Sequence, residues 1–311
     1  MAYAKHSVNY PAKVVSMNFL ITGGTGFIGS ALCAHLRQQG HYIVIKTRQP
    51  ELINDNMVGV KRLSEISSDT SFDVVINLAG EPIADKRWSV SQKQQLVDSR
   101  IAVTDEIVTY LSDAKIKPAV FISASAIGYY GTGLTDEVID ENCAGDDSFS
   151  SRLCAQWEAS AVAAEALGIR TCLLRIGIVL GGKGGALQKM IPPFSLGLGG
   201  RIGTGKQWMP WIHLQDLIGI IDHCIANSHI QGPVNCTAPN PVRNKDFTTT
   251  LGRCLKRPSI LPMPSFVINL LMGEMGRELL LAGKQVRPVK LEQLGFKFKY
   301  EYLETALASV L

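Results

Sequence analysis

Residues 18–40, NFLITGGTGFIGSALCAHLRQQG, decide the fold of this chain. The stretch opens with a short apolar run, which is typical of a buried parallel strand. It continues through glycines at three-residue intervals and then repeats apolar residues at helical spacing as far as Gly40. A strand, a glycine turn and a helix form the start of a βαβ unit, in which the helix N-terminus faces a phosphate. We therefore predict a dinucleotide site at this turn.

Each of the three spaced glycines has its own part in this prediction. Gly23 would permit the tight turn, and Gly26 would let the backbone approach a pyrophosphate closely. Gly29 would let the helix pack on the strand. The alternative is a turn that is only structural, but the strand and the helix on either side favour cofactor binding.

The end of the second predicted strand, residues 42–46, indicates which cofactor to expect. A cofactor with a free ribose hydroxyl usually meets Asp or Glu at this place, whereas a 2′-phosphate needs cations and hydroxyls. Here Thr47 and Arg48 follow the strand, Lys46 lies beside them, and no acid appears before Glu51. Because Arg48 offers a planar fork to a phosphate, we expect NADP(H) in preference to NAD(H). The alternative for Arg48 is a solvated surface cation.

Strands and helices alternate through the first half of the chain. Apolar strands are predicted at 73–80, 119–125 and 170–177, with helices over about 91–113 and 149–167 between them. The alternation predicts an α/β fold with a Rossmann-type, doubly wound parallel sheet. The small residues that end the strand at 73–80 would let a cofactor approach the carboxyl edge of the sheet.

Composition excludes several classes of protein. The 311 residues are 46% apolar and 19% charged, which is ordinary for a globular enzyme and wrong for disorder. The net charge of +4 is small and scattered, so we expect no nucleic acid partner. No apolar run reaches the roughly 18 residues of a membrane span, so we expect no membrane partner. Seven widely spaced cysteines without a C-x-x-C motif favour reduced thiols in a cytoplasmic protein.

The chain divides into three predicted parts. Residues 1–16 lack the apolar block of a signal peptide, and we expect them to form an N-terminal extension. Residues 17–180 would form the NADP-binding Rossmann domain, to which residues 211–238 return. Residues 181–210 and 239–311 would form a smaller α/β substrate lobe and the C-terminal domain.

The start of the second lobe is rich in glycine and proline and has no period, so we expect neither a repeat nor a regular element there. A long loop of this kind is usually a lid or a substrate wall. It would offer cations to a small, anionic substrate and flat apolar surface beside them, although plain solvated charge is the alternative. The cations are Lys183, Lys189, Arg201 and Lys206, and the apolar surface comes from Phe194, Trp208 and Trp211.

The stretch at 266–283 is predicted to be helical with a leucine-rich face. This face would pack on the lobe or pair with another subunit, so we expect a monomer or a homodimer. Met272 and Met275 lie at helical spacing and are expected in the core.

Several of these motifs follow one another as they do in a known family. The segments TGGTGFIG, NLAG, SASAIGYYG and LLRIGIVLG resemble those of extended short-chain dehydrogenase/reductases, a group that includes nucleotide-sugar epimerases. Longer segments, among them NLAGEPIADKRW and the tail RPSILPMPSF, are similar to an atypical, epimerase-like branch. Members of that branch are compared with a cell-division inhibitor and carry a C-terminal domain of unknown function. The resemblance covers about residues 17–309; it implies NADP binding and leaves the substrate open.

One departure from the family is informative. Active members of the wider group carry Tyr-x-x-x-Lys on the helix after the SAS strand, where the lysine lowers the tyrosine pKa and the tyrosine moves the proton. Here the helix reads FSSRLCAQWEAS. Aligned through Glu158, Ser150 stands at the tyrosine position and Cys154 at the lysine position. The resemblance therefore implies that the usual pair for hydride transfer is missing.

Two residues near the end of the preceding strand are candidate replacements for that pair. Ser125 lies near the place of the family's catalytic serine or threonine, although an alignment through Tyr130 and Gly131 puts Ala126 there. Tyr129 follows in the loop, where a phenol would face a nicotinamide. We predict Ser125 and Tyr129 as catalytic residues, with a packed or surface aromatic as the alternative for the tyrosine.

Three further polar side chains are interpreted as structural. Cys154 lies in the middle of a helix with no histidine in local spacing, so we expect an inert, packed thiol. His213 has no metal-ligand partner three or four residues on, and we expect a structural histidine and no metal site. Asp216 is expected to begin the next helix as an N-terminal acid.

The sequence thus favours an NADP(H)-dependent oxidoreductase or epimerase that acts on a small or nucleotide-linked substrate. The alternative is a non-catalytic NADP(H)-binding redox sensor or a regulatory, cell-division-related protein, because the Tyr and Lys are absent. The residues expected to contact the cofactor are Gly23, Thr25, Gly26, Phe27, Ile28, Gly29, Thr47, Arg48, Leu78, Ala79, Gly80, Glu81, Arg100 and Arg175.

Overall fold

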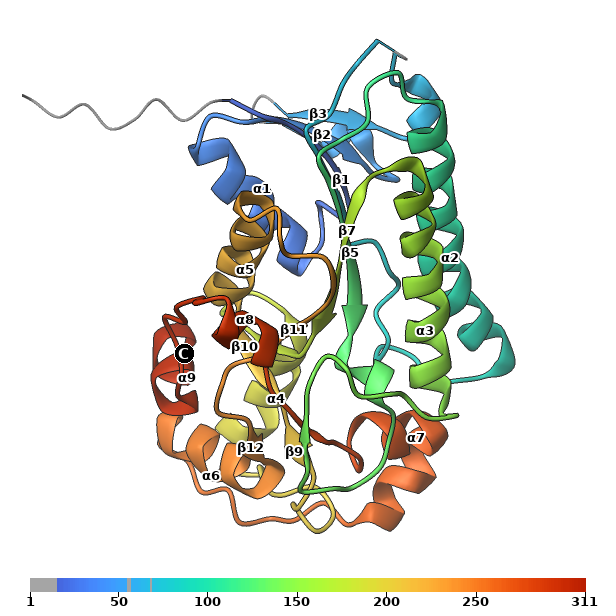
Figure 1. Ribbon diagram of the computed structural model, residues 1–311. Coiled ribbons are helices and arrows are strands. Elements are labelled where there is room, and N and C mark those ends of the chain that lie inside the picture. The colour runs from blue at the N-terminus through green and yellow to red at the C-terminus, as the bar shows by residue number, and fades with distance from the viewer. Residues whose placement is uncertain (1–15, 55–56, 68) are drawn as a thin grey trace, which may run out of the picture.

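A computed structural model of the protein describes residues 16–54, 57–67 and 69–311. The extension predicted for residues 1–16 lies outside the described residues, apart from Ser16, whose hydroxyl donates to the Gly40 carbonyl. A central sheet carries helices on both faces, and a smaller lobe lies beyond one end of it (Figure 1).

The central sheet confirms the predicted α/β class. Over the described ranges it has seven strands, all parallel, in the order β11-β7-β5-β4-β1-β2-β3. The chain runs outward from β1 to β3 and then crosses to β4 on the other side of β1, which is the doubly wound arrangement. The strands are β1 (Asn18–Thr22), β2 (Tyr42–Lys46), β3 (Val58–Val60), β4 (Val74–Asn77), β5 (Val120–Ala126), β7 (Arg170–Ile176) and β11 (Gly232–Cys236).

Two helical layers bury the faces of this sheet (Figure 1). Side chains alternate along β1, so that Phe19 and Ile21 join one core while Leu20 joins the other. The first core includes Leu32 of one helix and Ile220 of another, and the second is closed by the remaining pair of helices. The first pair is α1 (Phe27–Gln38) and α5 (Leu214–Ala226), and the second is α2 (Val90–Asp113) and α3 (Phe149–Val162).

The smaller lobe combines helices with short strand pairs. Its core contains Trp211, Phe247 and Leu307, all fully buried. The helices are α4 (Gly185–Ser195), α6 (Asn244–Cys254), α7 (Ser265–Leu279) and α9 (Leu303–Val310), whereas α8 (Val289–Gln293) packs on β11 and buries Leu291 in the main core. The strand pairs are β8 (Ile178–Leu180) with β10 (Trp211–His213), β9 (Trp208–Met209) with β12 (Val242–Arg243), and β6 (Val138–Ile139) with β13 (Gln285–Val286). The described residues also form the 3-10 turns η1 (Pro50–Leu52), η2 (Leu63–Glu65), η3 (Ile127–Tyr130) and η4 (Ala163–Leu167).

The prediction that the glycine- and proline-rich segment has no regular element was wrong over α4. Two prolines, Pro192 and Pro193, stand inside this helix, where each removes a backbone donor. The helix forms because Leu187 and Phe194, seven residues apart and therefore on one face, are both buried in the core of the smaller lobe. Tertiary burial thus overrides local composition.

The apolar surface predicted for a substrate also needs correction. Trp211 is fully buried and Phe194 is 5% exposed, so both belong to the core of the smaller lobe. Only Trp208 is half-exposed, and Arg243 stacks on its ring. The expectation for Met275 is confirmed, since it is buried against Trp88 and its neighbours beside α3.

The leucine-rich face of α7 is largely uncovered. Phe266, Leu270 and Leu271 are exposed, and the helix is kinked at Gly273, which has a φ of 59°. Pairing of this face with another subunit stays a prediction. None of the helices in the described residues is both long enough and apolar enough to cross a bilayer.

His213 is a structural histidine, as expected. It precedes α5 and its Nδ1 accepts a hydrogen bond from the Gln215 amide at 3.1 Å, which caps the helix. Its ring stacks on Tyr300 with 3.8 Å between centroids. Burial and then the Lys299 ammonium lower the pKa of His213 to about 4. The imidazole is therefore neutral at physiological pH and serves as an acceptor.

His213 should make the stability of the protein depend on pH. The unfolded chain protonates this imidazole near its ordinary pKa of 6.5, and the folded chain only near 4. Neutral His213 therefore makes its full contribution to the free energy of unfolding above pH 6.5. As the pH falls toward 4, about 3 kcal/mol of this free energy is lost. Urea unfolding across this range measures it. His213→Asn keeps a capping acceptor but cannot titrate, so its stability should fall less steeply; equal slopes would contradict the assignment.

Candidate functional site

The glycine turn after β1 closes against the loop that follows β4. Gly23 has a φ of 71°, and a Cβ added there would lie 2.5 Å from the Leu78 carbonyl carbon. A Cβ at Gly29 would lie 2.1 Å from the Gly23 carbonyl oxygen, so the first turn of α1 rests directly on the glycine turn. Both positions exclude a side chain, which agrees with the tight turn and the close packing that the sequence predicts.

Gly26 differs from these two glycines because the protein leaves the space beside it open. A Cβ built there meets one neighbour within 4 Å, the Gly23 carbonyl oxygen at 3.3 Å. Gly26 is also the N-cap of α1, which has no side-chain cap and no acid in its first turn. The first amides of a helix have no partner inside it, so this end offers free N–H donors and the positive end of the helix dipole. The residues present therefore fit a pyrophosphate.

The residues on either side of Gly26 differ in their exposure and in what they contact. Thr25 is exposed at the tip of the turn, and Ile28 is half-buried against the main core. The ring of Phe27 lies against the glycines that open the second lobe: a Cβ at Gly184 would be 2.6 Å from it, and one at Gly181 would be 2.8 Å from it. The second lobe thus reaches the start of α1.

A buried polar pair that the sequence pattern did not single out holds the β4 loop beside the turn. The Thr22 hydroxyl donates to the Asn77 side-chain oxygen at 2.6 Å, and the same oxygen accepts from the Ala79 amide at 3.2 Å. The Leu78 amide donates to the Thr22 carbonyl at 3.0 Å. In the sequence, this pair is visible only as one polar residue at the end of each of two apolar strands. It fixes Leu78 and Ala79, two predicted cofactor residues, at the crevice between β1 and β4.

Arg100 fixes the other predicted residues of this loop. It is 9% exposed on α2, donates to the Glu81 carbonyl at 3.0 Å, and lies 3.2 Å from a Cβ built at Gly80. Its guanidinium also lies over the Trp157 ring. Burial lowers the pKa of Arg100. The structure shows Arg100 as a residue that positions the loop, and its contact with a cofactor stays a prediction.

The end of β2 carries one free cation among the described residues and one paired cation. Arg48 is exposed, and within the described ranges no protein group pairs with it. Lys46, which the sequence placed beside it, forms an ion pair with Glu106 of α2. The Thr47 amide donates a hydrogen bond to the Val60 carbonyl at 2.9 Å. Arg48 is therefore the cation at this strand end that is available to a 2′-phosphate.

A buried ion pair organises the ends of β5 and β7. Arg175 is 2% exposed and binds Glu158 of α3 through two bonds of 2.8 Å. It also donates to the Tyr130 hydroxyl at 3.0 Å and to the Glu141 carbonyl at 3.2 Å. Four of its five N–H donors thus have protein partners. The cofactor contact predicted for Arg175 stays a prediction, and the role that the structure shows is to tie α3 to the sheet.

The same ion pair holds both candidate catalytic residues. The Ser125 hydroxyl donates to Glu158 at 2.6 Å and is 3% exposed. The Tyr129 ring lies 3.4 Å from the Arg175 guanidinium carbon, and the tyrosine is half-buried. No partner of its hydroxyl occurs in the described part of the chain. Tyr130 differs, because it is fully buried, its hydroxyl donates to Asn235 and burial raises its pKa.

The positions of the missing Tyr-x-x-x-Lys pair have other partners. The Ser150 hydroxyl donates to Glu278 of α7, and the Ser150 amide donates to the same carboxylate at 2.9 Å. Burial, followed by the Glu158 carboxylate, raises the pKa of the Cys154 thiol to about 11. Cys154 is 5% exposed, so the prediction of a packed thiol is confirmed. No cluster of three or more metal-ligating side chains occurs in the ranges that the structure describes.

Comparison with known proteins decides the family. Residues 19–236 match the model of the NAD dependent epimerase/dehydratase family, and residues 263–310 match a domain of unknown function, DUF1731. This chain belongs to the NAD dependent epimerase/dehydratase family. The match spans every strand of the central sheet and confirms the resemblance seen in the sequence.

The chain is similar to curated relatives in sequence and to solved structures in fold. The chain is 40% identical over 312 residues to the chloroplastic epimerase family protein SDR39U1 homolog of Arabidopsis thaliana, covering 96% of this chain and 88% of that one. The crystal structure of human epimerase family protein SDR39U1 (isoform 2) with NADPH aligns with a TM-score of 0.85 and 34% identity, over 94% and 99% of the chains. A nucleoside-diphosphate sugar epimerase from Corynebacterium glutamicum aligns with a TM-score of 0.77 and 30% identity, over 95% and 58%.

Gly26→Val should abolish binding of a nicotinamide dinucleotide without unfolding the protein. The branched side chain would fill the open space beside the α1 N-terminus, whereas the turn itself depends on Gly23. Cofactor fluorescence titration and urea unfolding measure the two effects. Gly29→Ala is the contrasting variant, because its Cβ would overlap the Gly23 carbonyl and should cost about 1–3 kcal/mol of stability. Loss of stability in Gly26→Val with binding intact would show that Gly26 serves packing.

Proposed function

We propose that this protein binds NADPH at the glycine turn and catalyses an NADPH-dependent reduction or epimerisation of a small or nucleotide-linked substrate. The observation that carries the proposal is the combination of an uncapped α1 with open space at Gly26 and an Arg48 at the end of β2 that has no partner among the described residues. The human relative crystallised with NADPH and the nucleoside-diphosphate sugar epimerase of similar fold support it.

Preference for NADPH over NADH follows from the charge at the end of β2. A carboxylate at this position would bind ribose hydroxyls, and none stands there. Arg48 presents several N–H donors in one plane, which matches the oxygens of a phosphate monoester. Because Arg48 has no ion pair within the described residues to give up, a bound 2′-phosphate would displace only water.

Arg48→Ala should weaken NADPH binding by about 1.5–3 kcal/mol and leave NADH binding nearly unchanged, because only NADPH carries the 2′-phosphate. Calorimetric titration of both cofactors on the same preparation measures the difference, and NADH is the internal control. An equal loss for both cofactors would contradict this assignment of Arg48.

Tyr129 is the group best placed to move a proton. When bound, NADPH supplies the hydride for a carbonyl carbon, and the carbonyl oxygen then needs a proton from the protein. Ser125 already gives its hydrogen to Glu158. Tyr129 follows β5 at its carboxyl end, and its hydroxyl has no partner in the described ranges. In this step the phenol O–H bond breaks and the proton passes to the substrate oxygen.

Tyr129→Phe should lower turnover about a hundredfold, because it removes the proton donor and keeps the ring that stacks on Arg175. Ser150→Ala and Cys154→Ala should each change turnover less than about threefold. NADPH consumption with sugar nucleotides, quinones and aldehydes measures the effects. If Cys154→Ala loses activity while Tyr129→Phe keeps it, the assignment of Tyr129 is wrong and a thiol mechanism takes its place.

A second candidate function is a non-catalytic NADPH-binding sensor or regulator. It is favoured by one observation: the hydroxyls of Ser125 and Ser150 are both committed to carboxylates, and Cys154 stands where the family has its lysine. Tight NADPH binding with no turnover across the whole substrate panel would favour this function over the enzyme.

We also propose that the protein works in the cytoplasm or an equally reducing compartment. All seven cysteines are free thiols, and most of them are buried. One relative is described as chloroplastic, so the compartment differs among members of the family.

A further inference from the structure

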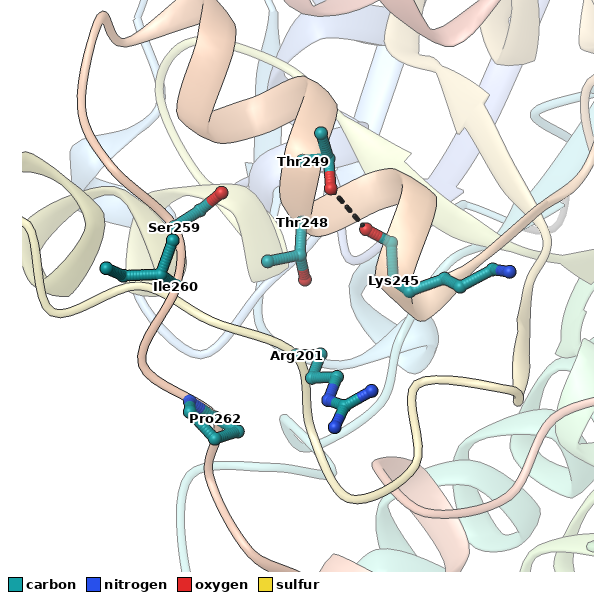
Figure 2. A pocket seen from close by; sticks show the side chains of 7 residues that line it. All are labelled: Arg201, Lys245, Thr248, Thr249, Ser259, Ile260 and Pro262. Atoms are coloured by element: carbon teal, nitrogen blue, oxygen red, sulfur yellow. Dashed lines mark hydrogen bonds between the residues drawn. The ribbon is translucent and has the colours of Figure 1, made fainter.

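A cavity of about 230 Å³ lies in the smaller lobe, between α6 and two chain segments that run side by side. The segments are 199–203 and 259–263, joined by hydrogen bonds from Leu261 to Gly199, from Met263 to Arg201 and from Gly203 to Met263. The polar side chains of the lining are Arg201, Lys245, Thr248, Thr249 and Ser259 (Figure 2). None of these residues belongs to the glycine turn or to the ends of β2, β4 and β5.

Two exposed cations of this lining start from neighbouring positions on the backbone. A Cβ built on Gly205 would lie 3.0 Å from the Lys245 Cβ and 3.3 Å from the Arg201 Cβ, so both side chains start within a few ångströms of one point. In the described residues, neither cation has a carboxylate partner. Both side chains are long and exposed, so either charge can turn toward an anion in the cavity.

A hydroxyl of the cavity wall without a protein partner in the described residues completes the arrangement. Thr248 is 2% exposed, yet within the described part of the chain its hydroxyl has no hydrogen-bond partner. Its neighbour Thr249 differs, because that hydroxyl donates to the Lys245 carbonyl at 2.9 Å. In Figure 2 the Thr248 oxygen points from α6 toward the segment that carries Arg201. The oxygen is not among the fully buried atoms without a partner, so it is open to the cavity and free to bond a ligand there.

The first backbone amides of α6 already donate to carbonyls of the protein, so an anion in the cavity would be bound by side chains. The Asn244 amide donates to the Gln207 carbonyl at 2.8 Å, and the Lys245 amide donates to the Gly205 carbonyl at 3.0 Å. Ser259 approaches the cavity because Gly252 has no side chain: a Cβ there would lie 2.7 Å from the Ser259 hydroxyl. The two cations, together with the hydroxyls of Thr248 and Ser259, match a tetrahedral oxyanion.

We propose that this cavity is a phosphate-binding site, held by Arg201, Lys245 and Thr248. It does not depend on the proposed function, because the cofactor site lies on other elements. The phosphate could belong to a soluble phosphorylated molecule or to a lipid headgroup. The mouth suits either, since Ile260 and Leu261 beside it are 80% and 49% exposed.

The test is a calorimetric titration of the full chain with inorganic phosphate in the presence of saturating NADPH, so that the glycine turn is filled. The same titration in the Gly26→Val background, where that turn is blocked, keeps the test valid if NADPH does not bind. We expect saturable binding, reduced at least about tenfold in Arg201→Ala, Lys245→Ala and the isosteric Thr248→Val. Arg253→Ala, which removes a cation from the far end of α6, should bind as the wild type does.

NADPH titration of each variant shows that it is folded and separates this inference from the proposed function. No phosphate binding by the wild type, or equal binding by Thr248→Val, would overturn the proposal. Co-sedimentation with phosphatidic acid vesicles distinguishes the two sources. Vesicle binding that Thr248→Val abolishes assigns the site to a lipid headgroup, and phosphate binding without vesicle binding assigns it to a soluble phosphorylated ligand.

Discussion

The bidentate bond between Arg175 and Glu158 is the interaction on which the reaction side of this structure depends. It joins β7 to α3, and the same two groups engage Ser125 at the end of β5 and both tyrosines of η3. Burying two charges is unfavourable unless each finds further hydrogen bonds, and here nearly every donor and acceptor has one. Removing either partner would leave an uncompensated buried charge, at a cost of about 3–5 kcal/mol.

This network also explains how the site remains ordered without the family's Tyr-x-x-x-Lys pair. In this chain Ser150 and Cys154 of α3 have structural partners: Ser150 is bonded to Glu278 of α7, and the Cys154 thiol is buried beneath η3. The helix therefore serves as a wall that fixes η3. On the loop side, Tyr129 stacks on Arg175 and its hydroxyl has no partner among the described residues.

The two lobes pack against each other beside the glycine turn, where an aromatic ring fits against glycines. Phe27 at the start of α1 fits against Gly181, Gly184 and Gly185, where side chains would collide with its ring. The start of the glycine-rich segment, which the sequence predicts as a lid or substrate wall, is thus packed closely on the first turn of α1. A movement of Phe27 would therefore displace the end of β8 and the start of α4, which contact its ring.

The sequence by itself determined the features that short-range patterns encode. The glycine turn, the strands at 18–22 and 42–46 and the long helices follow from periodicity over neighbouring residues, and the match to a family confirmed what they predicted. It also indicated Arg48, because the residue after the second strand lies at a defined place in this fold.

Only the tertiary structure decided which polar groups are free and which are taken. Arg175 is bound by Glu158, Lys46 by Glu106, and Trp211 is buried, although in sequence each was available to a ligand. The cavity between Arg201 and Lys245 depends on segments distant in the chain that meet at Gly205. The physical reason is that a charge or hydroxyl acquires its role from the partner that burial brings to it, and burial is a property of the folded chain.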